Sequence, residues 1–311
     1  MERLSSRDNQ TMGVFRHRKT LMLFLSMFLL FSYGRFIPYS NASGQVDADI
    51  PQPKVKLAGD TVAGDVNTAC EGVVECVWDD VRYIVNSPGR LDRNGLMVLG
   101  GISLVTGGLF VADDEIQDFF GKRHTDSRDD IADFFDTLGS FEVIFAANVA
   151  LAGGGWVFRD SLEGDRLFKT ALASTEAQLF TEGICSLLKF AIGRERPEEG
   201  HGHTSFSPFT HWNSSMPSSH AGRAFAMAAV FSETYEQPLP LIAYTAATLI
   251  SISRVYQDKH FSSDVFIGAA IGYAVGKMLI RKHLRSNKRW TIIPASIGSL
   301  GTPGILVRRS F

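Results

Sequence analysis

The chain has 311 residues, 45% of them hydrophobic and 21% charged, which is enough apolar material to bury one large domain or two small ones. Its formal net charge of -2 excludes the strongly basic surface that draws a protein onto nucleic acid, so we expect no nucleic-acid partner. The mean hydropathy of +0.03 is low for a chain that crosses a membrane many times, although several windows are strongly apolar.

Residues 1–42 have the pattern of an export signal. A basic start at residues 16–19 precedes the apolar stretch 21–31, and residues 40–42 offer small side chains where a signal peptidase would cut. An uncleaved N-terminal anchor helix is the alternative, although the apolar stretch is shorter than the roughly 20 residues of a spanning helix. We expect the rest of the chain to be exported, with residues 43–93 as an N-terminal extension that contains one helix near 76–85.

The three cysteines fit an exported protein. Cys70 and Cys76 bracket a short stretch of the extension, so an oxidising compartment would allow a disulfide bond between them. Cys185 remains in the apolar run 184–191, where we interpret it as a small buried hydrophobe rather than a reactive thiol.

Beyond the extension, apolar segments of helical length alternate with turns and charged clusters, which is typical of an all-α helical bundle. These segments are residues 96–111, 141–158, 170–192, 221–233, 239–253 and 265–280. We therefore assign residues 94–289 to one helical domain of about six core helices. In residues 290–311, apolar runs alternate with Gly and Pro, which favours a short extended C-terminal tail. The charged, phenylalanine-bearing stretch 113–136 is expected to form an amphipathic surface helix pair, or else a lipid-interface element.

The first group of polar residues follows the apolar segment 170–192. Lys189 and Arg196 are seven residues apart, about two helical turns, and are therefore predicted to lie on one helix face. Pro197 favours an extended conformation for Arg196 at the helix end, where a guanidinium group can grip phosphate oxygens. Alone, this pair fits equally an ordinary interaction of basic side chains with the carbonyl end of a helix.

The second group, Ser218, Ser219 and His220, opens the apolar segment 221–233. Free backbone N–H groups at a helix start form a ready anion site, and here a hydroxyl and an imidazole stand beside it. Ordinary capping of the helix by serine is the alternative.

The third group lies between the last two apolar segments. Arg254 comes at the end of one helix, and His260 stands just before the next, with Asp264 four residues further on. That spacing lets the carboxylate of Asp264 reach one imidazole nitrogen, which fixes the tautomer and leaves the other nitrogen bare as a nucleophile or base. A histidine that only caps a helix or faces solvent is the alternative.

Helix parity places all three groups at one end of the bundle. Phosphoryl transfer requires such a set: cations that hold the equatorial oxygens, an in-line nucleophile and an acid for the leaving group. The active-site loops are therefore predicted at that end, and we expect neither a metal site nor a cofactor.

At these residues the sequence resembles the type 2 phosphatidic acid phosphatase superfamily, which also includes bacterial non-specific acid phosphatases and vanadium haloperoxidases. The resemblance covers residues 170–280 and implies that Lys189, Arg196 and Arg254 bind phosphate together with Ser218 and the amide of Ser219. It further implies the catalytic residues: His260 as the nucleophile that forms a phosphohistidine, His220 as the acid for the leaving oxygen, and Asp264 as the residue that orients His260. The family usually has Gly where Ser219 stands, so rate or substrate preference would change if that position requires a positive φ.

The expected function is a metal-independent phosphohydrolase that acts on lipid or isoprenoid phosphates or pyrophosphates. A broad-specificity periplasmic acid phosphatase is the alternative within the same chemistry, and a vanadate-dependent haloperoxidase is the alternative from another reaction class. A further alternative, from a non-enzyme class, is an inactive exported binding module that retains the anion pocket. The expected partners are a phosphorylated lipid or small phosphoester and a membrane surface.

The membrane topology is harder to predict. If every apolar segment spanned the bilayer, the active-site loops would lie in the cytoplasm and the basic stretch 281–289 outside, against the positive-inside tendency. Glu176, Glu182 and Lys189 within one apolar segment also argue against spanning, because charges in lipid are costly. We therefore expect an exported bundle that does not span, or one in which segment 141–158 only dips. In either case the site faces the periplasm, in the periplasm or on the inner membrane.

Overall fold

The computed structural model describes residues 73–212, 214–285, 289–297 and 302–310. The predicted export signal and most of the extension, including Cys70, lie outside the described residues, so the signal and the Cys70–Cys76 disulfide stay predictions. The elements are α2 (Val73–Val85), α3 (Arg93–Gly121), α4 (Asp126–Leu138), α5 (Phe141–Val157), α6 (Leu162–Ile192), α7 (Ser219–Thr234), α8 (Leu239–Tyr256), α9 (Ser262–Arg285), β1 (Arg289–Ile297) and β2 (Thr302–Ser310).

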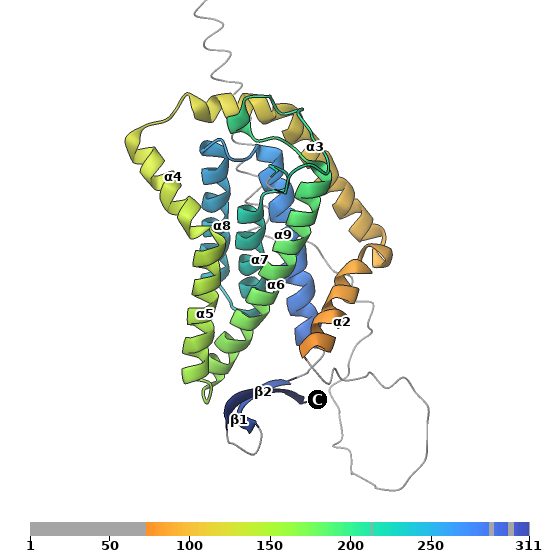
Figure 1. Cartoon of the computed structure of the whole chain (residues 1–311), viewed down its shortest axis with the longest axis vertical. Helices are drawn as coiled ribbons and strands as arrows, with labels where there is room; N and C mark the ends of the chain where they lie inside the picture. Colours follow the sequence, from red (N-terminus) through yellow and green to blue (C-terminus); the bar gives the residue numbers. More distant parts are fainter. Residues whose placement is uncertain (1–72, 213, 286–288, 298–301, 311) are drawn as a thin grey trace, which may run out of the picture.

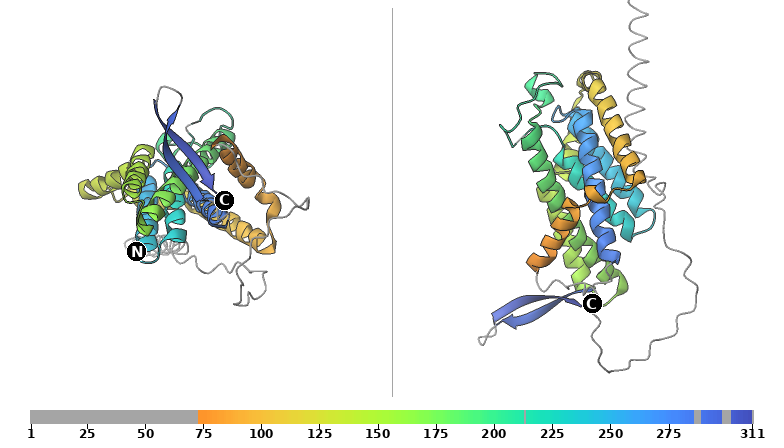
Figure 2. Two further views of the ribbon diagram at one scale, coloured as in Figure 1. Left: turned by 90° about the horizontal axis from the view of Figure 1, so that it is seen from below. Right: turned by 90° about the vertical axis from the view of Figure 1, so that its right-hand side faces the viewer.

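The predicted all-α fold is confirmed. Each of the predicted apolar segments corresponds to one helix, with segment 141–158 running one residue past the end of α5, and the helix expected near 76–85 is α2. The stretch 113–136 is not a separate helix pair, because α3 runs without a break from the apolar segment before it through Gly121. The C-terminal tail is extended, as predicted, and its strands β1 and β2 form an antiparallel hairpin beyond the end of the bundle (Figures 1 and 2).

Helix α7 occupies the centre of the bundle (Figure 1). Helices α6, α8 and α9 pack around it, α5 lies along α6, and α3 and α4 cover α8 and α9. Alanines dominate the buried face of α7, and Phe225 and Val230 are completely inaccessible to solvent. Small side chains on the central helix let its neighbours approach closely and carry the loops at one end toward one another.

Glycines make the contact between α7 and α9 especially close. A Cβ atom at Gly272 would lie 1.9 Å from the carbonyl oxygen of Gly222, and one at Gly268 would lie 2.3 Å from that of Ser218. Because α9 starts next to His260 and α7 starts next to Ser218, this contact sets the spacing of two of the three predicted groups.

Three of the described helices, α3, α8 and α9, are long and apolar enough to cross a membrane, and the bent pair of α4 and α5 would make a fourth. Only 6% of the apolar window of α3 is buried within the protein. A helix that exposes so much apolar surface is suited to lipid rather than to water. These features are those of a membrane protein.

The charged residues of α6 do not argue against a membrane location, contrary to the sequence-based expectation. Glu182 pairs with Arg223 of α7, Glu176 lies beside His283 of α9, and Lys189 is buried in the protein interior. These charges face protein groups, so the cost of placing them in lipid does not arise.

The α7–α9 contact can be tested at Gly272. We expect Gly272→Ala to destabilise the fold by about 1–3 kcal/mol, because the new methyl group would overlap the backbone of α7. Gly183→Ala on α6 is the matched control, because nothing lies within 4 Å of its added Cβ; it should be neutral or slightly stabilising. Thermal unfolding of the purified proteins in detergent measures both, and equal loss in the two variants would contradict the close contact.

Candidate active site

The three predicted groups meet at the end of the bundle opposite the hairpin, where α6 ends, α7 begins and α8 turns into α9 (Figure 1). The end of α4 joins them. The common placement predicted from helix parity is confirmed.

Lys189 and Arg196 meet for a reason other than the predicted helical spacing. Helix α6 ends at Ile192, and Gly193 takes the left-handed conformation with φ 64°, with its N–H donating to the carbonyl of Lys189 at 2.8 Å. A Cβ at Gly193 would lie 2.0 Å from the carbonyl oxygen of Ser207, so only glycine fits. Arg196 therefore lies beyond the helix in the predicted extended conformation, with ψ 154°.

The ammonium group of Lys189 is almost buried. It donates hydrogen bonds to the carbonyl oxygens of Ser214 (2.6 Å) and Ser215 (3.3 Å), which fixes the loop before α7. Burial, followed by the positive charge of Arg196, lowers the pKa of Lys189 to about 8. The side chain is therefore still largely charged at neutral pH and can bind an anion.

The start of α7 does not have the geometry of ordinary serine capping. Ser218 is the N-cap residue, but its side chain makes no capping hydrogen bond, and its N–H donates to the carbonyl of Asp264 at 2.9 Å. The hydroxyls of Ser218 and Ser219 are both buried, and neither has a hydrogen-bond partner among the described residues. Buried polar groups normally have partners, so two such hydroxyls at a helix N-terminus are typical of a ligand site.

Serine in place of glycine at position 219 causes no backbone strain. Ser219 is the first residue of α7, and the described non-glycine residues with positive φ are Phe209 and Asp258. A positive φ is therefore not needed at this position.

His260 is 2% exposed and lies among positive charges. Burial, followed by the charges of Lys189, Arg254 and Arg196, lowers the pKa of His260 well below its ordinary value. The imidazole is therefore neutral at neutral pH, which is the form that can attack an electrophile.

Asp264 does not bond directly to His260, which corrects the sequence-based prediction. In the structure, Oδ2 of Asp264 accepts hydrogen bonds from the hydroxyl of Ser215 (2.5 Å) and the N–H of Phe261 (2.9 Å). The Ser215 oxygen in turn lies 3.4 Å from Nδ1 of His260. The physical reason is that Asp264 caps the first turn of α9, and the Ser215 hydroxyl stands between the carboxylate and the ring.

Arg194 holds the other oxygen of Asp264. Its side chain is completely buried and donates to Asp264 at 2.6 Å and to Asp113 of α3 at 2.8 Å. The centres of the Phe110 and Phe261 rings lie 4.7 and 4.2 Å from its guanidinium carbon.

Asp113 also accepts hydrogen bonds from the hydroxyls of Ser262 and Ser263. This Asp113–Arg194–Asp264 network ties α3, the end of α6 and the start of α9 together.

His220 lies between an acidic and a basic side chain. Its Nε2 is 3.5 Å from Asp136 of α4, which also accepts a hydrogen bond from Arg254, and its Nδ1 is 3.3 Å from Arg223. Burial, followed by the charges of Arg254 and Arg223, lowers the pKa of His220 far below its ordinary value.

Several residues of this site were missed by the sequence analysis. These are Asp113, Asp136, Arg194, Ser215 and Arg223. Arg223 carried a usable signal, because it is the one charged residue in the small and apolar run 221–231. Asp113 and Asp136 carried none, since they belong to a stretch with many surface carboxylates.

Residues 170–288 match the family model described as PAP2 superfamily, which confirms the resemblance inferred from the sequence. A lipid A 1-phosphatase of Porphyromonas gingivalis is 31% identical over 135 residues, which cover 42% of this chain and 27% of that protein. A decaprenylphosphoryl-5-phosphoribose phosphatase of Mycobacterium tuberculosis is 30% identical over 96 residues, 31% of this chain and 51% of that protein. The match thus spans about a quarter to a half of the length of these curated relatives.

Among solved structures, the crystal structure of Aquifex aeolicus LpxE aligns with 54% of this chain and 94% of its own, with 22% identity and a TM-score of 0.41.

The buried network can be tested at Arg194. We expect Arg194→Met to cost about 3–5 kcal/mol of stability, because it leaves Asp113 and Asp264 as uncompensated buried carboxylates. Arg166→Met is the control, because the pair of Arg166 with Glu163 is at least half exposed and contributes less than about 1 kcal/mol. Denaturant unfolding followed by tryptophan fluorescence gives both values. If Arg194→Met lost no more unfolding free energy than Arg166→Met, the network would not stabilise the fold.

Proposed function

On the premise that residues 170–288 belong to the PAP2 superfamily, we propose that this protein hydrolyses lipid phosphates through a covalent intermediate on His260, without a metal ion. One observation carries the proposal: a buried, neutral imidazole stands among Lys189, Arg196 and Arg254 at the open N-terminus of α7. The cations and free helix N–H groups supply the positive charge that phosphoryl transfer requires.

In the first step, Lys189, Arg196 and Arg254 hold the phosphate oxygens, together with the Ser218 hydroxyl and the amide of Ser219. Nδ1 of His260 is the nitrogen near Ser215, so the lone pair of Nε2 attacks phosphorus. A phosphorus–nitrogen bond forms as the bond to the leaving oxygen breaks, and the leaving oxygen takes a proton from His220. The neutral state of His260 removes the need for a separate base at this step.

His220 must be protonated to act as this acid, although the cations around it lower its pKa. A phosphate dianion among those cations would offset their charge and raise the pKa of His220 on binding. Asp136, 3.5 Å from Nε2 of His220, acts in the same direction. We propose that binding of the substrate phosphate itself causes His220 to become protonated.

In the second step, water attacks the phosphohistidine. His220, now neutral, takes a proton from that water, and the phosphorus–nitrogen bond breaks to release inorganic phosphate and restore His260. Asp264 acts in both steps through Ser215, which keeps Nδ1 of His260 oriented and Nε2 directed at phosphorus.

A lipid substrate is favoured by the surface beside the site. A hollow of about 260 Å³ opens between α3, α4 and α8, lined mostly by apolar side chains, with Ser253 and Tyr256 on either side of Arg254 in sequence. An acyl or isoprenoid chain in this hollow would place its phosphate near Arg254. The names of the relatives, lipid A 1-phosphatase and decaprenylphosphoryl-5-phosphoribose phosphatase, fit the same substrate class.

The proposed location is the membrane, with the site on the periplasmic face. The site lies at the end of the bundle where α9 starts, whereas Arg281 and Lys282 lie near the end of α9, at the opposite end. Under the positive-inside tendency the basic end faces the cytoplasm, so the site faces the other side.

A phosphate-release screen tests the function. The purified full chain in detergent is given phosphatidic acid, lipid A, isoprenyl phosphates and pyrophosphates, and soluble sugar and aryl phosphates. We expect release from one or more of the lipids, and a loss of at least about a thousandfold in His260→Ala, because the nucleophile is gone.

The control for this screen is His201→Ala, which removes an exposed histidine paired with Glu195 and should keep full activity. Full activity in His260→Ala would contradict the mechanism. Release from soluble phosphates alone would instead support the broad-specificity phosphatase and contradict the lipid substrate.

A further inference from the structure

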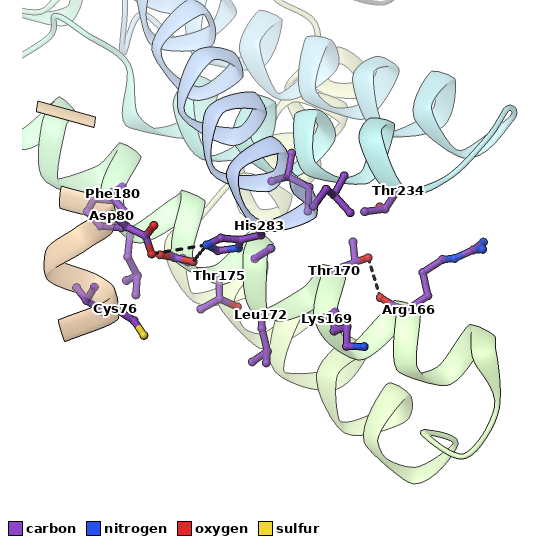
Figure 3. A pocket seen from close by; sticks show the side chains of 16 residues that line it. Cys76, Asp80, Arg166, Lys169, Thr170, Leu172, Thr175, Phe180, Thr234 and His283 are labelled. Carbon is purple, nitrogen blue, oxygen red and sulfur yellow. Dashed lines mark hydrogen bonds and ion pairs between the residues drawn. The ribbon is translucent and has the colours of Figure 1, made fainter. Parts of the chain in front are cut away.

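A second polar cluster lies far from the active site, toward the hairpin end of the bundle. A cavity of about 630 Å³ is bounded by α2, α6 and α9, and most of its lining is apolar. Asp80 of α2 and His283 of α9 point toward each other on its wall (Figure 3). Glu176 of α6 lines the same cavity and belongs to the same cluster. No step of the proposed reaction uses these residues.

The spacing of these three side chains is that of metal ligands. One ligand atom of each lies within 4.8 Å of the other two. Nε2 of His283 is 3.6 Å from Oδ2 of Asp80 and 3.5 Å from Oε2 of Glu176. In tetrahedral coordination with metal–ligand bonds of about 2.0–2.2 Å, the ligand atoms are roughly 3.3–3.6 Å apart, whereas direct hydrogen bonds are about 2.7–3.2 Å long.

The local charge also fits a divalent cation. Lys282 donates to Oδ1 of Asp80 at 2.5 Å and to Asp79 at 2.7 Å, which leaves Oδ2 of Asp80 on the side of His283. Asp80 and Glu176 carry two negative charges and Lys282 one positive charge, which leaves one net negative charge at the cluster; Asp79, the other partner of Lys282, is mostly exposed. Asp80 is 5% exposed, and a buried surplus of negative charge is costly unless a cation balances it.

We propose that Asp80, Glu176 and His283 bind a divalent transition-metal ion of the Zn²⁺ type. Two carboxylate oxygens and one imidazole nitrogen are a ligand set that such ions accept, and the adjoining cavity has room for water as the fourth ligand. Because each ligand comes from a different helix, the ion fastens α2 to α6 and α9. Its role is structural, since the site lies at the other end of the bundle from His260.

The competing explanation is a protonated His283 held between the two carboxylates. That arrangement needs no metal, and its stability depends on the protonation of the imidazole rather than on zinc. The two explanations therefore differ in their response to zinc at constant pH.

The test is a zinc titration of the full chain in detergent after treatment with a chelator. By isothermal titration calorimetry we expect one Zn²⁺ per chain, and a rise in the unfolding temperature when zinc is added. Glu176→Gln, which keeps the side-chain shape, and His283→Ala should each weaken zinc binding at least about tenfold and abolish the rise. Circular dichroism checks that both variants are folded.

The matched control is His201→Ala. His201 belongs to a second group with Glu195 and Glu199, in which His201 and Glu199 are exposed. Zinc binding should be unchanged in this variant, and Glu176→Gln should retain phosphate release, so that the outcome is independent of the proposed function. No zinc binding by the wild type, or equal binding by Glu176→Gln and His283→Ala, would overturn the proposal.

Discussion

The candidate active site depends on one buried interaction, the pairing of Arg194 with Asp113 and Asp264. Burying three charges costs desolvation energy. The ion pairs and hydrogen bonds of the network offset that cost only when all three side chains are in place. The network therefore favours a single arrangement of α3, the loop after α6 and the start of α9. Through Ser215 that arrangement reaches His260, so the orientation of the proposed nucleophile follows from a contact that includes no phosphate-binding residue.

Around His260 the protein places cations at the ends of two helices and a serine at the start of a third. Lys189 and Arg254 lie in the last turns of their helices, and Ser218 opens α7. Each location is ordinary for its residue type, and the close contact of α7 with α9 holds the start of α7 against the start of α9. Burial, followed by the charges of Lys189 and Arg254, lowers the pKa of His260, so the cations that would bind an anion also favour the neutral imidazole.

Local patterns predicted the helices and the three groups of polar residues at their ends, because periodicity and helix-end residues are properties of short stretches. Arg196 was placed correctly for the wrong reason, since Gly193 ends the helix before the predicted second turn. The partners of Arg194 could not be predicted, because Asp113 is 81 residues away and is chemically like its exposed neighbours. Cys70 and the export signal lie outside the described residues and remain sequence-based predictions.

The central claim is that the imidazole of His260 forms a covalent bond to the phosphoryl group before water attacks. The most direct measurement is the stereochemical course at phosphorus, with a phosphorothioate ester made chiral by one heavy oxygen isotope and hydrolysed in water that carries the third oxygen isotope, so that the released thiophosphate is itself chiral. Two successive in-line displacements, first by His260 and then by water, each invert the centre, so the account predicts net retention of configuration. Net inversion would mean a single direct attack by water and would contradict a covalent intermediate on His260.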